Sequence, residues 1–351
     1  MSDLRSDLSL ISIIIPCRNE EEFIDKCLDS VVGNDYPKGK VEVLVVDGMS
    51  DDRTREVIET YTRRYPFIRL LINRKKITAS GLNKGIKEAR GEYILWISAH
   101  NEYSKDYVRK CMEHATRFEA DNVGGIIKVV PRNDSFIGKS IAMVLSHPFG
   151  VGNSAFRTGT RKPKLVDTVF GGCYKREIFE EIGLFNESLI RGQDMEFSLR
   201  MKRAGYKTFL VPQIVSYYHA RSDLKTYIQH NFINGLWAIM PMKFVSHMPV
   251  ALRHLVPLVF VISLVGLGLL SFVSLFFFRV FLLVFIVYFL TNSYFSIKVA
   301  LKEKDWRCAF LMLFNFTLLH ISYGFGSFLG LLRVIPSKQF WENRIKWLLA
   351  T

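Results

Sequence analysis

The sequence lacks the patterns that most often identify nucleotide-binding or metal-binding proteins. It has no GxGxxG and no GxxxxGK[ST] segment, so neither a dinucleotide-binding fold nor a P-loop is indicated. Its five cysteines are scattered, without a CxxC pair or Cys/His ligand spacing, and we expect them to be reduced and unligated. No nucleic-acid recognition motif accompanies the net charge of +14, which therefore suits an anionic membrane surface or phosphorylated substrates.

The beginning of the chain also lacks an apolar run long enough for a cleavable signal, because residues 1–7 are polar and acidic. We therefore expect the N-terminal domain to stay in the cytoplasm. A chain of 351 residues fits about two domains, and its hydropathy is strongly asymmetric. We expect a soluble α/β domain at 1–226, amphipathic interface helices at 227–254, about three transmembrane helices at 255–334, and a basic tail at 335–351.

Apolar runs that alternate with helical patterns predict the architecture of the first domain. Buried strands are expected at 10–16, 41–47, 69–72 and 91–97, with helices between them. This alternation implies a mainly parallel sheet that is covered by helices on both faces. Ligands bind such sheets beyond the carboxyl ends of the strands.

Polar side chains stand at three of these strand ends. They are Pro16, Arg18 and Glu20 after the first strand, Asp47 at the end of the second, and Ser98, Ala99 and His100 after the fourth. A carboxylate after a strand is often only a helix cap, and a polar turn after a core strand can be ordinary. Taken together, the three strand ends predict one crevice large enough for a nucleotide.

Two segments, Ile13–Glu21 and Val45–Thr54, resemble the opening signatures of the family 2 glycosyltransferases, which have a GT-A fold. The resemblance continues through Gly81–Ile86, the strand after Gly91 and the Gly171-Gly172 pair, and it closes at Gly192–Arg200. It covers about residues 10–225. Within the family, the chain most resembles the bacterial succinoglycan-type, membrane-anchored glucosyltransferases.

The resemblance implies an inverting transfer from a nucleotide-diphospho-sugar, usually a UDP-sugar. Asp194 matches the general base, which removes the proton of an acceptor hydroxyl as that hydroxyl attacks the anomeric carbon. A helix cap is the alternative role for Asp194, and a base at a helix start could serve both. The implied nucleotide-sugar site comprises Pro16, Arg18, Glu20, Asp47, Asn83, Ser98 and Ala99, and the implied acceptor or phosphate site comprises Gly171, Gly172, Gln193, Arg221 and Arg157.

One departure from the family concerns the metal. The family places a DxD pair at the end of its fourth strand, where this chain has Ser98, Ala99 and His100. Three arrangements stay open: Mn²⁺ held through His100 with ligands such as Glu102, cationic side chains that stabilise the diphosphate instead, and an impaired site. We favour a divalent cation, Mn²⁺ or Mg²⁺, at His100, although imidazole suits Mn²⁺ better than Mg²⁺.

Residues 147–164 combine glycine, serine, asparagine and proline with basic residues such as Arg157. A long polar loop in a compact domain is usually functional or disordered. We interpret it as a mobile basic flap near the diphosphate or the acceptor's phosphates, with a solvated loop as the alternative. Further along the chain, His219 and Arg221 match a loop that returns to the catalytic site in relatives; His219 could ligate a metal or simply be packed.

The apolar segments 255–278, 280–297 and 308–332 are long enough to cross a membrane, and only Arg279 separates the first two. Three crossings would place the basic tail on the outer face, against the positive-inside tendency, which a re-entrant third segment or an oligomer would relieve. Asn315 and His320 are expected to bond between helices, and Gly324, Gly326 and Gly330 permit close helix packing.

The sequence thus predicts a multi-pass cell-membrane glycosyltransferase with a cytoplasmic catalytic domain. Gln229 is not followed by the rest of a QxxRW motif, so we expect the addition of one sugar to a polyprenyl-diphosphate-linked saccharide rather than polymer synthesis. Two alternatives stay open. One is a polyprenyl-phosphate glycosyltransferase of the dolichyl-phosphate mannose synthase type, and the other is a degenerate transferase that acts as a binding partner. Membrane lipid is an expected partner and nucleic acid is not.

Overall fold

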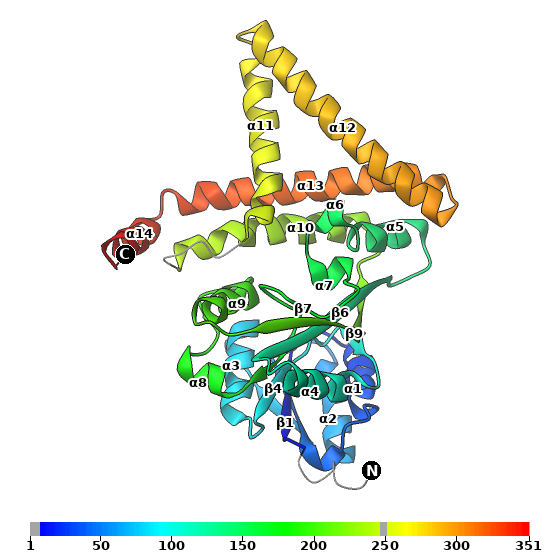
Figure 1. Ribbon diagram of the computed structural model, residues 1–351, viewed down its shortest axis with the longest axis vertical. Helices are drawn as coiled ribbons and strands as arrows, with labels where there is room; N and C mark the ends of the chain where they lie inside the picture. Colours follow the sequence, from blue (N-terminus) through cyan, green and yellow to red (C-terminus); the bar gives the residue numbers. More distant parts are fainter. Residues whose placement is uncertain (1–7, 246–250, 351) are drawn as a thin grey trace. The chain divides into compact units, whose positions relative to one another are not determined.

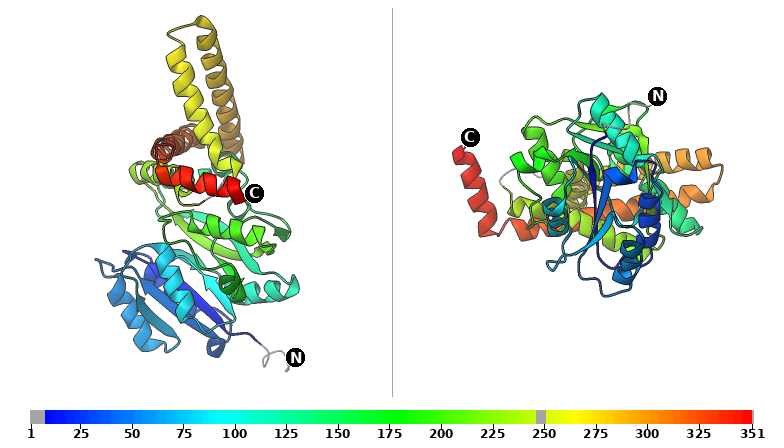
Figure 2. Two further views of the ribbon diagram at one scale, coloured as in Figure 1. Left: turned by 90° about the vertical axis from the view of Figure 1, so that its left-hand side faces the viewer. Right: turned by 90° about the horizontal axis from the view of Figure 1, so that it is seen from below.

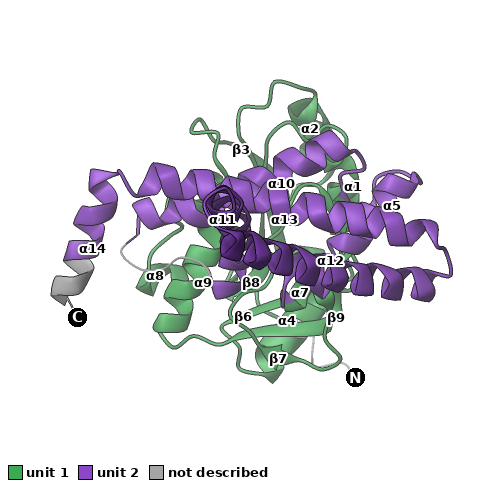
Figure 3. Ribbon diagram, turned by 90° about the horizontal axis from the view of Figure 1, so that it is seen from above, with its two compact units in different colours: residues 1–128, 155–219 green, residues 129–154, 220–351 purple. Residues whose placement is uncertain are grey.

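The computed structural model describes residues 8–245 and 251–350, with the backbone alone for residues 346–350. It divides into two compact units, residues 1–128 with 155–219 and residues 129–154 with 220–351 (Figure 3). Residues 129–154 fall inside the range 1–226 predicted for the first domain, yet they group with the C-terminal helices. His247, in the predicted amphipathic segment, lies outside the described residues.

The first unit is built on a sheet whose strand order is β3-β2-β1-β4-β8-β6-β9-β5, with β7 paired to β9. The four predicted strands form as β1 (Ile11–Cys17), β2 (Val41–Asp47), β3 (Ile68–Ile72) and β4 (Tyr93–Trp96), and they pair in parallel. The parallel half of the sheet is therefore confirmed. The remaining strands are β5 (Asn101–Tyr103), β6 (Asn122–Pro131), β7 (Lys164–Leu165), β8 (Gly172–Lys175) and β9 (Thr208–Ala220), and the pairings β4–β8, β6–β8, β5–β9 and β7–β9 are antiparallel.

Helices cover both faces of this sheet (Figure 1). Successive side chains of a strand point to opposite faces, so Ile13 and Ile15 pack on one side and Ile14 on the other. The first face receives α1 (Ile24–Val32), α2 (Thr54–Arg64) and α4 (Tyr107–Arg117), and the second receives α3 (Thr78–Glu88), α8 (Glu177–Glu181) and α9 (Gln193–Arg203). Because strands β1 and β2 are buried on both faces, their sequences are continuous apolar runs.

A buried carboxylate fixes the amino-terminal edge of the parallel strands. The hydroxyl of Ser12 on β1 donates to Oε1 of Glu42 on β2 at 2.5 Å, and the N–H of Gly91 donates to the same hydroxyl at 2.8 Å. Nε of Arg90 donates to Oε2 of Glu42 at 3.0 Å. Three strands are thereby held in one register, in which Cys17 lies opposite Asp47 at the carboxyl ends.

The second unit is helical. It contains α5 (Phe136–Val144), α6 (Pro148–Val151), α10 (Leu224–Ile239), α11 (Val256–Leu270), α12 (Leu275–Glu303), α13 (Arg307–Val334) and α14 (Lys338–Ala350), with short 3-10 turns at Met240–Lys243 and Leu252–Leu255. Three stretches of the described residues are long and apolar enough to cross a membrane: Leu252–Leu270, Leu275–Glu303 and Arg307–Val334.

The break between the first two apolar helices is not at Arg279, as the sequence suggested. It lies at residues 271–274, and Arg279 belongs to α12. The side chain of Ser274 accepts the N–H of Phe276 and thereby caps the start of α12. A capping serine is a stronger signal for a helix start than one basic residue, which a helix interior tolerates.

Helix α13 packs closely on α10 and α11, as the small residues predicted. A Cβ at Gly326 would lie 1.9 Å from the Phe232 carbonyl oxygen, and one at Gly324 would lie 2.4 Å from the Pro257 carbonyl oxygen. Two polar residues of α13, Asn315 and His320, also bond between helices, as predicted. Nδ2 of Asn315 donates to the Ser140 hydroxyl on α5 at 2.6 Å, and Nε2 of His320 lies 2.8 Å from the Phe149 carbonyl oxygen on α6.

Replacing Gly91 with alanine should destabilise the first unit. The added Cβ would lie 2.6 Å from the Ser12 backbone nitrogen and 2.9 Å from the Leu10 carbonyl oxygen, and neither atom can move without disturbing β1. We expect a cost of about 2 kcal/mol, which corresponds to a fall of roughly 5 °C in melting temperature. Gly39→Ala is the matched control, because nothing lies within 4 Å of its Cβ position. Equal melting temperatures for the two variants would contradict this account.

Candidate functional site

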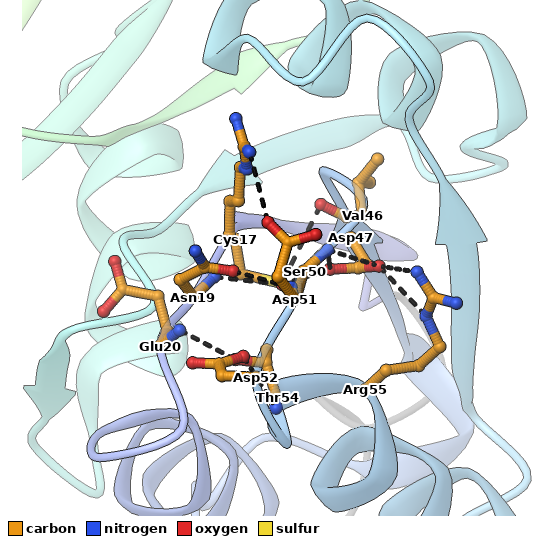
Figure 4. Close-up of polar contacts among 11 residues, drawn as sticks. Cys17, Asn19, Glu20, Val46, Asp47, Ser50, Asp51, Asp52, Thr54 and Arg55 are labelled. Carbon is orange, nitrogen blue, oxygen red and sulfur yellow. Dashed lines mark hydrogen bonds and ion pairs between the residues drawn. The ribbon is translucent and has the colours of Figure 1, made fainter.

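Two loops after the first two parallel strands are joined by hydrogen bonds (Figure 4). The backbone N–H of Asn19 donates to the Ser50 hydroxyl at 3.0 Å, and the backbone N–H of Asp51 donates to Oδ1 of Asn19 at 2.9 Å. The N–H of Glu20 donates to the Thr54 hydroxyl at 2.7 Å. Residues 18–20 and 50–54 therefore form one rigid rim beyond the carboxyl ends of β1 and β2.

Asp47, at the end of β2, stabilises this rim through hydrogen bonds to Ser50 and Arg55. Its side chain is fully buried, and it accepts bonds from the Ser50 hydroxyl at 2.5 Å and from Nη2 of Arg55 at 2.7 Å (Figure 4). Both carboxylate oxygens are thus engaged within the fold, so in this structure Asp47 positions the loop that follows it. Arg55 was not predicted from the sequence. The available signal was its position as the second residue of α2, the helix that follows an aspartate-ended strand.

The predicted residues after β1 and β4 come together. Nδ1 of His100 lies 3.1 Å from Oε1 of Glu20, and the Ser98 hydroxyl lies 3.3 Å from the same ring nitrogen. The N–H of Ser98 donates to the Tyr103 hydroxyl at 2.7 Å, and Ala99 is buried in the core. Of the other rim residues, Pro16 ends β1, and Arg18 makes an exposed ion pair with Asp51 at 3.4 Å.

The side chains after β4 do not assemble a metal site of the usual kind. No group of three or more His, Cys, Asp and Glu residues that could hold an ion occurs among the described residues. Glu102, which was expected to assist His100, instead has its Oε1 atom 2.7 Å from Nε2 of His219. Glu20 and His100 could thus supply two metal ligands, a carboxylate oxygen and a ring nitrogen, whereas Mg²⁺ prefers near-octahedral coordination by oxygen. These residues fit a protein-held divalent cation poorly.

Asp194 is the second residue of α9, two positions after the N-cap residue Gly192, whose φ is 78°. The alternative role as an N-cap is therefore wrong. Burial raises the pKa of the Asp194 carboxyl above its ordinary value, and the backbone N–H of Met195 partly opposes this shift. A raised pKa makes a carboxylate a stronger base toward a hydroxyl. The neighbouring Gln193 is buried, and its Oε1 atom has no hydrogen-bond partner among the described residues.

The two glycines of the Gly171-Gly172 pair have positive φ values, 66° and 121°. A Cβ at Gly171 would lie 2.5 Å from the carbonyl oxygen of Trp96, so close packing of β8 on β4 requires glycine there.

Asn83, which was predicted to bind the nucleotide sugar, makes structural hydrogen bonds in the fold. Its amide donates to the Phe185 carbonyl oxygen at 2.9 Å and accepts the Phe185 N–H at 3.0 Å, which ties α3 to the loop before α9.

Residues 147–164 are not a plain loop. They contain α6, α7 (Ala155–Thr158) and the beginning of β7, and the division between the two units falls after residue 154. Arg157 belongs to the first unit, with His100 and Asp194, whereas Arg221 belongs to the second. His219 lies in strand β9 rather than in a loop.

The model of the glycosyl transferase family 2 matches residues 12–183. The chain is 33% identical to the dolichyl N-acetyl-alpha-D-glucosaminyl phosphate 3-beta-D-2,3-diacetamido-2,3-dideoxy-beta-D-glucuronosyltransferase of Methanococcus voltae, over 65% of this chain and 72% of that protein. It is 26% identical to the succinoglycan biosynthesis protein ExoA of Rhizobium meliloti (strain 1021), over 76% of this chain and 83% of that protein.

Among solved structures, the chain is similar to S. aureus TarS 1-349 in complex with UDP, with a TM-score of 0.45 and 18% identity over 66% of this chain and 65% of that one. It is also similar to the mannosyltransferase PcManGT of Pyrobaculum calidifontis in complex with GDP-Man and Mn²⁺. That match has a TM-score of 0.48 and 21% identity over 66% of this chain and 63% of that one. The chain spans slightly less than two thirds of each of these solved chains.

Replacing Arg55 with methionine should weaken the rim. The buried Asp47 carboxylate would lose a 2.7 Å ion pair and keep only its bonds to Ser50, which should cost about 2 kcal/mol of unfolding free energy. If these loops bind the nucleoside, as the sequence predicts, nucleotide affinity should fall in parallel, because residues 50–54 lose their anchor. Arg63→Met is the control: its pair with Glu59 is exposed and should contribute less than about 0.5 kcal/mol. Thermal melts and nucleotide titrations check both effects, and an Arg55 variant that behaves like the control would refute the anchoring role.

Proposed function

Because the chain belongs to glycosyl transferase family 2, we propose that it transfers one sugar, with inversion, from a UDP-sugar to a polyprenyl-diphosphate-linked saccharide. The observation that carries the proposal is the placement of Asp194, a carboxylate of raised pKa, at the start of α9 in the unit that also contains the strand-end rim. A relative named for a dolichyl-phosphate-linked sugar, and another named for succinoglycan biosynthesis, favour a lipid-linked saccharide as the acceptor.

In the proposed reaction, Asp194 accepts the proton of the acceptor hydroxyl while its oxygen bonds to the anomeric carbon. The bond from that carbon to the diphosphate breaks, and the nucleoside diphosphate leaves with the electron pair. The joined loops at 18–20 and 50–54 bind the nucleoside, and Asp47 with Arg55 keeps them in place. Mn²⁺ or Mg²⁺ at His100 stays a prediction, and none of these steps involves an ion.

The alternative of a degenerate binding partner has less support than catalysis. Removing a carboxylate from water costs free energy, and a protein that only binds has no need to keep the partly buried Asp194 carboxylate. The other alternative is transfer directly to a polyprenyl phosphate. Its product would carry one sugar on the lipid phosphate, whereas the proposed product carries a lipid-linked saccharide extended by one sugar. Mass spectrometry of the lipid product therefore separates the two acceptor classes.

Purified protein in detergent should form a glycosylated lipid from one member of a panel of nucleotide sugars, and Asp194→Asn should lower that rate at least about 1,000-fold. Because the base works only when ionised, kcat/KM should fall as the pH drops through the raised pKa of Asp194, at a higher pH than for an ordinary aspartate. Asp134→Asn, at an exposed position, is the control. Full activity in the Asp194 variant, or no turnover with any donor, would overturn the proposal.

We further propose that α11 and α12 form a hairpin in the membrane and that α13 lies along the membrane surface. Figure 1 shows α13 running across the foot of the α11–α12 pair, and Figure 2 (left) shows it end-on beside them. The apolar window of α13 is 44% buried, against 6% for α12, because α10 and α5 pack along it. Because α13 is already partly covered by α10 and α5, less of its apolar surface would be in contact with lipid if it crossed a bilayer.

In the proposed arrangement, the tail would lie on the side from which the hairpin enters the membrane. With a cytoplasmic catalytic unit, Arg333 and Lys338 would then lie on the cytoplasmic face, as the positive-inside tendency favours. Labelling with a membrane-impermeant maleimide tests it, since the five native cysteines are buried. Cysteines introduced at Gln339 and at the exposed Arg63 should be labelled from the same side of sealed vesicles. Labelling of position 339 from the opposite side to position 63 would show that α13 crosses the membrane.

A further inference from the structure

Transfer from a nucleotide sugar leaves a diphosphate that gains negative charge as the glycosidic bond breaks. Something positive must stabilise that charge in a site from which water is largely excluded. The residues after β4 fit a metal ion poorly, because Ser98 and His100 occupy the positions of the family's paired acids. The first unit should therefore contain another source of positive charge near the end of β4.

Arg157, on α7, is a cation without a counterion. Its Nη1 atom is buried and has no hydrogen-bond partner, and the described residues supply no carboxylate within ion-pair distance of it. Its guanidinium carbon lies 5.8 Å from the ring centroid of Phe156 and 5.7 Å from that of Tyr218. Burial lowers the pKa of its guanidinium, yet an arginine stays charged in proteins. The side chain as a whole is half-buried, and a charge that is partly removed from water without a partner is costly, so its retention points to an anion that binds there.

The surroundings of Arg157 place that anion beside the predicted donor site. The ring of Tyr218 contacts both Arg157 and His100, and its centroid lies 5.7 Å from the His100 ring. Backbone pairing of Asn101 with Tyr218 fixes this arrangement. On the other side, Phe156 contacts Phe170 at 6.4 Å, directly before the glycine pair that packs on the end of β4. Arg157 is therefore linked by ring contacts to the residues at the ends of both β4 and β9.

We propose that Arg157 binds the diphosphate of the nucleotide sugar and supplies the positive charge that stabilises the leaving group. The inference rests on the proposed function. When the bond between the anomeric carbon and the diphosphate oxygen breaks, the electron pair stays on that oxygen, and the guanidinium donates hydrogen bonds to the oxyanion. A guanidinium suits this role because its planar N–H groups can engage two phosphate oxygens at once. Stacking on Tyr218 and Phe156 holds it in place.

The experiment compares the wild type with Arg157→Gln, Arg157→Lys and Arg203→Gln, a control that removes an exposed guanidinium outside residues 147–164. Binding of UDP and of uridine is measured by calorimetry in EDTA, and transfer is measured in EDTA, Mn²⁺ and Mg²⁺. We expect the wild type to keep most of its activity in EDTA. Arg157→Gln should bind UDP about 10- to 100-fold more weakly, with uridine binding unchanged, and should transfer about 100-fold more slowly. Arg157→Lys should recover part of the loss, and Arg203→Gln should match the wild type.

Melting temperatures of all variants show whether a loss reflects unfolding, and unchanged uridine binding confirms an intact nucleoside site. Activity that disappears in EDTA, returns with Mn²⁺ and is insensitive to Arg157→Gln would assign the charge to a metal and overturn the inference. A variant with normal UDP binding but a raised KM for the lipid acceptor would place Arg157 on the acceptor's phosphate and also overturn it. Failure of the wild type to bind any nucleoside diphosphate would instead reject the proposed function.

Discussion

A charge that is removed from water needs a partner, and this constraint organises the catalytic unit. Glu42 is buried and bonds to Ser12 and Arg90, which fixes the register of the parallel strands. Asp47 is buried and bonds to Arg55, which fixes the rim. Glu196 on α9 is buried and pairs with Arg200, whose guanidinium also donates to the carbonyl oxygens of residues 182–184. Each pair is complete within the chain. Arg157 differs from these residues: its side chain is half-buried, its Nη1 atom is fully buried, and the described residues supply no carboxylate partner for it. This contrast is the reason for assigning an external anion to Arg157.

The parallel half of the sheet could be predicted because each of its strands is recognisable from its own stretch of sequence. Strands buried on both faces are continuous apolar runs, and their polar ends mark the ligand-binding edge without knowledge of any distant contact. The approach of Glu20 to His100 followed from strand order alone. The roles of individual side chains at this edge were harder to predict. Whether Asp47 faces a ligand or a helix depends on Arg55, and only the folded position of α2 decides that.

The antiparallel half was less predictable because its pairings join residues far apart in sequence. Glu102 could not be assigned from its neighbours, since the register of β5 on β9 brings it to His219 and away from His100. The same limit applies to residues 129–154. Their apolar pattern fits a catalytic domain or a membrane unit equally well, and only the bonds from Asn315 and His320 show that α5 and α6 pack on α13.

The packing of α5 and α6 on α13 also determines which fragments of the chain can fold by themselves. The chain enters the helical unit at residue 129, leaves it after residue 154, and enters it again at residue 220. A fragment that ends at the last residue of the α/β motifs would keep α5 and α6 but lose the helix that covers them. The apolar faces of Ile141 and Val144, fully buried in the intact chain, would then be open to water. The α/β unit and the helical unit are therefore thermodynamically interdependent, and a stable fragment of the α/β unit requires replacement of residues 129–154 in addition to removal of the C-terminal helices.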